Sequence, residues 1–111
     1  MANIARDITR FPSKKAIDEL FKKARRVIAH PGLHILLAPK AGPIGRILII
    51  ASRKTGNAPE RNTIRRRLKS IFYEEKLYAK EFDCIAIVKK EGISLSFAEL
   101  KDLLLKAFPI S

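Results

Sequence analysis

The sequence predicts an α+β fold, a two-layer α/β sandwich of about four strands and three helices in the order α-β-β-β-α-β-α. Three observations support this class. Apolar residues recur at helical spacing in three segments, and short apolar runs bounded by Gly and Pro lie between those segments. Apolar residues also make up 47% of the chain, which is enough to build a folded core. We expect the helices to cover one side of the sheet, in a topology that the pattern leaves open.

The length of the chain limits it to one hydrophobic core. A chain of 111 residues can bury one core but is too short for two ordinary domains. We therefore expect a single domain over residues 1–111, in which residues 1–10 form a loose basic lead-in.

The first helix is expected just after Pro12, because Ser13 can cap a helix start. An apolar stripe follows at the spacing of one helix face, formed by Ile17, Leu20, Phe21 and Ala24. The other face is rich in lysine and arginine, so this helix is expected to extend a positive surface.

Three strands are expected between the first and second helices. Residues 27–29 predict a short strand, and residues 33–38 and 46–52 predict stronger strands that a Pro- and Gly-rich turn joins in hairpin fashion. Residues 47–50 are apolar at every position, which suits a strand in the centre of a sheet, although the periodicity of so short a run is also compatible with a helix.

A basic segment from Arg53 to Lys69 is the most unusual stretch of the chain. Seven of its seventeen residues are lysine or arginine against one glutamate, which gives +6 of the +12 net charge of the chain. A turn at Gly56-Asn57 and the proline that follows predict a helix start. Apolar residues at helical spacing predict that the helix continues to about Lys80.

Two sides of this helix are expected to have different functions, one in packing and one in binding. The packing side is formed by four apolar residues, Ile64, Leu68, Ile71 and Phe72. A neighbouring side, which can dock on a polyanion, is formed by Asn62, Arg65, Arg66 and Lys69. Arg61 is expected to curl around the helix start, and Arg67 lies on the opposite flank.

The last part of the chain predicts one more strand and one more helix. Residues 82–88 form an apolar run around Cys84, whose thiol is interpreted as a small core residue. Ser96 and Glu99 have the spacing of a capping box, which predicts a helix start, and Pro109 is expected to end that helix.

The net charge of +12 and the pI near 10.3 favour a polyanionic partner. The longest apolar runs are far below the roughly 20 residues that span a bilayer, so membrane insertion is not expected. The chain lacks a signal-peptide core, and its single cysteine excludes an intramolecular disulfide. Together these features predict a cytoplasmic protein.

No catalytic set of side chains is evident in the sequence. A protein nuclease usually displays clustered carboxylates or a pair of histidines, and neither is found convincingly. His30 and His34 are separated by Pro31-Gly32, which prevents one helix from presenting both. We therefore predict no catalytic residues, so that any reaction would be performed by another component.

The segment from Lys54 to Lys69 resembles the signature of the bacterial ribonuclease P protein component, in which a basic Gly-Asn-Ala loop leads to Arg61-Asn62 and further arginines. The similarity extends over residues 10–108. It implies a holoenzyme whose catalytic RNA removes the 5′ leader of precursor tRNA, with Mg²⁺ held mainly by that RNA. It also implies a left-handed β-α-β crossover around the basic helix. No obligatory protein partner is inferred.

The resemblance also implies roles for individual residues. The RNA-facing set is Arg53, Lys54, Arg61, Asn62, Arg65, Arg66 and Lys69. Asn62 is in addition implied to lie near a metal ion that bridges to RNA. A cleft between the sheet and the first helix is implied to receive the single-stranded leader, at the positions of Ile17, Phe21 and His34.

Two functions remain open at this point. The first is an accessory subunit of the ribonuclease P ribozyme, which positions RNA and neutralises its charge. The second is a structural RNA-binding protein of the ribosomal kind, which takes no part in a reaction. The Gly-Asn-Ala and Arg-Asn elements favour the first, whereas composition alone does not separate the two.

Overall fold

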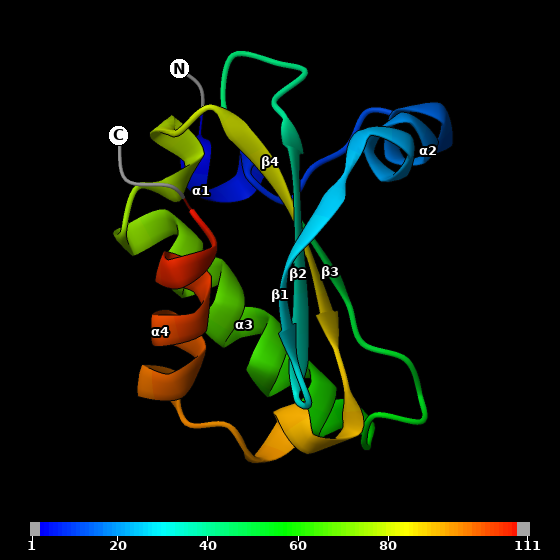
Figure 1. Cartoon of the computed structure of the whole chain (residues 1–111), viewed down its shortest axis with the longest axis vertical. Helices are drawn as coiled ribbons and strands as arrows, with labels where there is room; N and C mark the ends of the chain where they lie inside the picture. The colour runs from blue at the N-terminus through cyan, green and yellow to red at the C-terminus, as the bar shows by residue number, and fades with distance from the viewer. Residues whose placement is uncertain (1–2, 109–111) are drawn as a thin grey trace.

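The computed structural model describes residues 3–108. The helices are α1 (Ile4–Asp7), α2 (Lys14–Lys23), α3 (Ala58–Glu74) and α4 (Phe97–Ala107), with 3₁₀ helices η1 (Leu77–Ala79) and η2 (Lys90–Ser94). The strands are β1 (Arg25–His30), β2 (Leu33–Pro39), β3 (Ile47–Ile50) and β4 (Phe82–Val88). The predicted α+β class and the order α-β-β-β-α-β-α are confirmed, and α1 and the two 3₁₀ helices are added to them (Figure 1).

The four strands form one mixed sheet in the order β1-β2-β4-β3. β2 pairs antiparallel with both β1 and β4, whereas β3 runs parallel to β4. The predicted hairpin between residues 33–38 and 46–52 is therefore wrong, because β4 lies between the two strands. The central position predicted for residues 47–50 is also wrong, since β3 is an edge strand. Its alternate side chains join the apolar clusters on the two faces of the sheet, which explains why all four residues are apolar.

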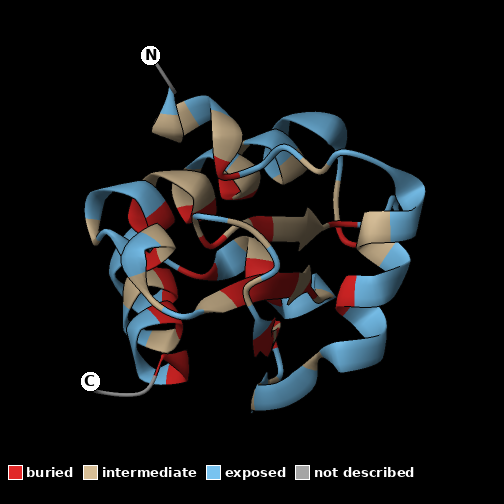
Figure 2. Ribbon diagram, turned by 90° about the horizontal axis from the view of Figure 1, so that it is seen from above, coloured by how far each residue is buried: buried red, intermediate tan, exposed pale blue. Residues whose placement is uncertain are grey.

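Helices cover the two faces of the sheet unequally. α1, α3 and α4 lie on one face, where they enclose the main core (Figure 1). α2 lies on the other face, near one end of the sheet, and packs there through Leu20 against Ala38 and Ile85. The expectation that all helices lie on one side is therefore wrong for α2. Most residues of α2 are exposed, as the right-hand helix of Figure 2 shows. Because α2 covers only one end of this second face, strand residues such as Leu36 and Ile87 remain partly exposed there.

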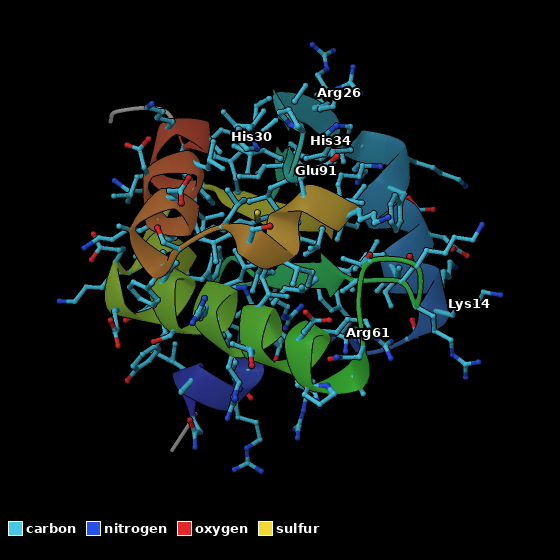
Figure 3. All side chains as sticks on the ribbon, turned by 90° about the horizontal axis from the view of Figure 1, so that it is seen from below. Lys14, Arg26, His30, His34, Arg61 and Glu91 are labelled. Carbon is cyan, nitrogen blue, oxygen red and sulfur yellow. The ribbon has the colours of Figure 1, made fainter. Side chains whose placement is uncertain are left out.

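α3 connects two parallel neighbours, β3 and β4, and so forms a β-α-β unit. Such crossovers are right-handed in about 98% of cases. Followed through Figures 1 and 3, this crossover is left-handed, as the resemblance implied. It places α3 against the core face of the sheet.

The N-terminal segment is ordered rather than loose. Asn3 caps α1 by accepting a hydrogen bond from the main-chain N–H of Arg6 at 3.2 Å. Ile8, which follows the helix, is fully buried in the main core, and Ile4 packs against that core. The predicted loose lead-in over residues 1–10 is therefore wrong for residues 3–8. The four-residue helix was missed because it is too short to show an apolar period.

The basic helix α3 begins with a capping box. The Asn57 side chain accepts from the Glu60 N–H, and the Glu60 carboxylate accepts from the Asn57 N–H, each at 2.9 Å. The helix ends at Glu74, so its predicted continuation to Lys80 is wrong. Lys76 takes a left-handed conformation with φ 54°, and this reversal leads into η1. The capping box predicted from Ser96 and Glu99 is confirmed at the start of α4, whereas Pro109 lies outside the described residues.

Candidate RNA-binding surfaces

The apolar side of α3 is fixed in the core. All four residues of the predicted packing side are at most 3% exposed, namely Ile64, Leu68, Ile71 and Phe72. Phe72 also meets the ring of Phe108 edge-on, with 6.1 Å between ring centroids. These contacts hold the helix in one rotational setting, so the side that it presents to solvent is defined by the core.

The solvent side of α3 is cationic along its first three turns. Asn62 and Arg66 are exposed, and Arg65 and Lys69 are partly buried. The two carboxylates at the end of the helix lie on other sides. Glu74 accepts a hydrogen bond from the Ser70 hydroxyl at 3.0 Å, and Glu75 forms an ion pair with Lys101 of α4 at 3.6 Å. Glu60, in the first turn, accepts from the Asn57 N–H and lines a separate hollow with Arg67. The basic side is therefore left without a carboxylate of its own helix.

A groove of about 310 Å³ lies at the outer edge of the sheet, beside β3. It is lined by Thr9, Ile47, Leu48, Ile49, Arg65, Arg66 and Lys69. Both ends of the edge are occupied, since the Ile47 N–H donates to the Ile8 carbonyl at 2.7 Å and the Arg65 guanidinium donates to the Ala51 carbonyl at 3.2 Å. Covering an edge in this way limits pairing with another strand. The groove thus presents cations next to a protected sheet edge.

A shallow hollow of about 630 Å³ lies at the N-terminal end of α3. Its lining consists of Ala58, Pro59, Asn62, Thr63, Arg65 and Arg66. Arg65 and Arg66 line both this hollow and the groove, so the two form one continuous surface. We call this surface the basic side of α3.

The loop before α3 brings further cations to this region. The Thr55 side chain is buried, and its hydroxyl donates to the Val88 carbonyl at 3.3 Å, which ties the loop to the end of β4. Arg53 and Lys54 are exposed on this anchored loop. Arg61 is partly buried near the start of α3 (Figure 3), and its buried Nε has no hydrogen-bond partner within residues 3–108.

The open face of the sheet beside α2 has a different character. Leu36, His34 and Ile87 are partly buried on this face, and the Phe21 ring of α2 is 42% exposed. Ile17 lies one helical turn before Phe21 and is partly buried. The three positions of the predicted leader cleft therefore belong to α2 and to the strand face on which it packs.

A cavity of about 360 Å³ lies between α2 and the end of the sheet at which β2 ends and β4 begins. Phe11, Ala16 and Leu20 form part of its apolar wall, and Lys15, Lys23 and Arg46 contribute positive charge. The buried Asp83 also lines it, and its carboxylate accepts from the main-chain N–H groups of Ala41 and Arg46, at 3.2 and 2.9 Å. Its lining does not include Ile17, Phe21 or His34, so the leader positions and this cavity are separate parts of one face.

His34 lies on the β1 side of the sheet, away from Arg61 on α3 (Figure 3). Desolvation lowers the pKa of its imidazole, and the positive charges of Lys89 and Arg26 lower that pKa further. Both effects favour the neutral form of the ring. A neutral ring on an open strand face can stack on a nucleobase without carrying charge of its own.

Metal ligands of the usual kind do not gather in the described part of the chain. No group of three or more His, Cys, Asp or Glu side chains that could hold a metal ion occurs among residues 3–108. Asn62, the residue implied to lie near a metal ion, is exposed and offers one amide oxygen. None of the helices within residues 3–108 is both long enough and apolar enough to cross a membrane.

Two features of the basic side were missed by the reasoning from sequence. The bond from Arg65 to Ala51 joins residues on separate elements and has no sequence signal. The exposed Tyr73, in contrast, could have been found, because it stands eleven residues after Asn62 and so returns to the same side of the helix after three turns.

Comparison with known proteins identifies the family. The family described as Ribonuclease P matches residues 6–110. The chain belongs to this family. A ribonuclease P protein component from Citrifermentans bemidjiense is 31% identical over 103 residues, which cover 79% of this chain and 89% of that protein. The component from Bacillus velezensis is 37% identical over 76 residues, covering 68% and 65% of the two chains.

Solved ribonuclease P proteins have the same fold. The Staphylococcus aureus protein superposes with a TM-score of 0.73 at 21% identity, over 88% of this chain and 90% of that one. The Thermotoga maritima protein, in a complex with 1-(4-fluorophenyl)-2-thiourea, gives 0.71 at 25% identity, over 86% and 94%. Membership associates the chain with ribonuclease P, and a ribonuclease P protein component has an RNA partner in the holoenzyme.

Proposed function

We propose that the chain is the protein subunit of a ribonuclease P holoenzyme and binds the catalytic RNA through the basic side of α3. The observation that carries the proposal is the division of α3 into a buried apolar side and a cationic side that lacks a carboxylate. A rigid row of cations neutralises phosphates and releases their condensed counterions. Arg53, Lys54 and Arg61 extend the surface around the helix start.

The 5′ leader of precursor tRNA binds on the opposite face of the sheet, beside α2. Single-stranded RNA is held by stacking of its bases and by cations near its backbone. The exposed Phe21 ring and the His34 ring support the first requirement, and the lysines of α2 support the second. Because the two RNA ligands occupy opposite faces, one subunit can hold both at once.

The protein acts as an accessory subunit of an endoribonuclease whose catalytic centre is RNA. The reaction is the magnesium-dependent removal of the leader in tRNA 5′-end maturation, in the cytoplasm. Mg²⁺ is held mainly by the RNA. Amide oxygens are among the ligands that such hard cations accept, so Asn62 is the side chain of the basic side that is suited to lie near an RNA-bound ion.

Reconstitution tests this function. The catalytic RNA of the same source is assayed for precursor tRNA cleavage at low Mg²⁺, alone and with the protein. Faster cleavage with the protein, and none by the protein alone, is the expected result. Cleavage by purified protein free of RNA would contradict the assignment of catalysis to RNA. Equal rates with and without the protein would contradict the subunit role.

A further inference from the structure

An exposed tyrosine, Tyr73, continues the line of the basic side of α3 at the C-terminal end of the helix. At 100° per residue, Tyr73 falls between Lys69 and Arg66 and within about 20° of Asn62. Its side chain is 43% exposed, although the apolar residues next to it in the sequence are buried. Tyr73 therefore belongs to the cationic side of the helix and not to the packing side.

A second tyrosine supports the ring of Tyr73. The ring centroids of Tyr73 and Tyr78 are 5.9 Å apart and their planes differ by 24°, which is a stacked arrangement. The left-handed turn at Lys76 brings Tyr78 back beside the end of α3. Tyr78 packs against the main core, and its carbonyl accepts from the Gly45 N–H at 2.8 Å. The supporting ring is thus fixed by the fold.

This arrangement is suited to one class of ligand. A planar aromatic ring with an exposed surface, held from behind by a second ring, is a stacking platform for a nucleobase. Two cations of the basic side precede Tyr73 along the helix. Lys69 lies one turn before it and Arg66 two turns before it. A nucleotide needs both, because its base stacks while the adjoining phosphates pair with cations.

We propose that Tyr73 stacks on an unpaired nucleotide of the catalytic RNA and extends the RNA-binding surface to the C-terminal end of α3. The inference rests on the proposed function, because it takes the same RNA as the partner. An unpaired base is required, since the faces of a base inside a duplex are covered by its neighbours. The contact adds stacking to an interface that otherwise acts through charge.

Affinity for the catalytic RNA, measured over a range of salt concentrations, tests the inference. Tyr73→Ala is expected to bind about 5- to 150-fold more weakly, the effect of losing one stacked base. The slope of log affinity against log salt is expected to stay unchanged, because no charge is removed. Tyr73→Phe is expected to bind like the unchanged protein, since it keeps the ring.

Two further variants serve as controls. Phe97→Ala removes an aromatic ring of similar exposure, 39%, from α4, and it should leave affinity unchanged. Arg66→Ala should weaken binding and reduce the salt slope by about 1.

If Tyr73→Ala binds normally while Arg66→Ala binds more weakly, the stacking inference is overturned and the proposed interface stands. If neither variant changes affinity, the proposed interface itself is overturned. If Tyr73→Phe loses as much affinity as Tyr73→Ala, Tyr73 acts through its hydroxyl group and not by stacking, and the inference is overturned.

Discussion

The guanidinium of Arg65 donates a hydrogen bond to the main-chain carbonyl of Ala51, at 3.2 Å. This bond joins the first half of α3 to the residue that follows β3, next to the loop that carries Arg53 and Lys54. Arg65 therefore differs from Arg66, which is exposed and has no such bond within residues 3–108. Arg65 therefore stabilises the fold in addition to lying on the basic side, whereas Arg66 does only the latter.

The difference between these two arginines can be measured as stability. Arg65→Ala should lower the free energy of unfolding by about 1 to 2 kcal/mol, because it removes a hydrogen bond from a charged donor. Arg66→Ala should change it by no more than about 0.5 kcal/mol, as is usual for an exposed side chain. Urea denaturation of both variants provides the comparison. Equal stabilities would mean that the Arg65 bond does not persist in solution.

Charge on the two flanks of α3 should affect RNA binding differently. Lys69→Ala is expected to reduce the slope of log affinity against log salt by about 1, because one phosphate contact is lost. Arg67→Ala removes the same charge from the opposite flank, where Arg67 lies near Ile93 and Leu95, and should leave the slope unchanged. Binding titrations with the catalytic RNA at several salt concentrations distinguish the two. Identical slopes for both variants would indicate non-directional attraction in place of a defined interface.

The segment that includes α1 is expected to contribute to stability. Ile8→Ala should lower the free energy of unfolding by about 2 to 4 kcal/mol, because it leaves a cavity at a fully buried position. Arg10→Ala, at an exposed position two residues later, is the matched control and should be neutral. The measurement is again urea denaturation. A neutral Ile8→Ala would show that the N-terminal segment does not pack on the core in solution.

Phe21 should distinguish precursor tRNA from mature tRNA. Phe21→Ala is expected to weaken holoenzyme binding of leader-bearing precursor by about 5- to 150-fold, as for one stacked base, and to leave binding of mature tRNA nearly unchanged. Leu105→Ala, which removes a side chain of comparable exposure from α4, is the control. Equal losses for the two tRNAs would place Phe21 outside the leader site.

The pKa of His34 should respond to the charge of Lys89. Lys89→Met removes one of the positive charges that lower this pKa, so the pKa should rise toward its ordinary value. Because the folded pKa lies below the unfolded one, the unfolded state is protonated first as the pH falls. The contribution of His34 to stability is therefore fully present above the unfolded value of about 6.5 and is lost as the pH falls from that value through the folded pKa. An NMR titration of the His34 ring gives the pKa directly. Lys90→Met is the control, and an equal shift in both variants would contradict the specific effect of Lys89.

Local patterns in the sequence predicted the elements whose signals are local. Ser96 and Glu99 predicted the start of α4, because a capping box depends on residues three apart. Ile64 and Leu68 predicted the buried side of α3 for the same reason, since helical periodicity is a property of neighbours. The buried position of Cys84 followed from the apolar run that surrounds it.

Long-range relationships could not be predicted in this way. The insertion of β4 between β2 and β3 depends on pairing between segments more than thirty residues apart, which leaves no local trace. The position of α2 on the other face of the sheet follows from that topology. Tyr73 differs from these cases, because its spacing from Asn62 is a local signal but an uncharged ring adds nothing to the charge pattern that marks this side of the helix.

Site-specific crosslinking tests the division of labour between the two faces most directly. Cys84 is fully buried. Within residues 3–108, a photocrosslinker that reacts with thiols will therefore attach to a cysteine introduced at an exposed position. In the holoenzyme with precursor tRNA, Ala58→Cys on α3 should crosslink to the catalytic RNA and Lys14→Cys on α2 to the leader. Ala98→Cys on α4 should crosslink to neither. Crosslinks from Lys14→Cys to the catalytic RNA and from Ala58→Cys to the leader would contradict the assignment of the two faces.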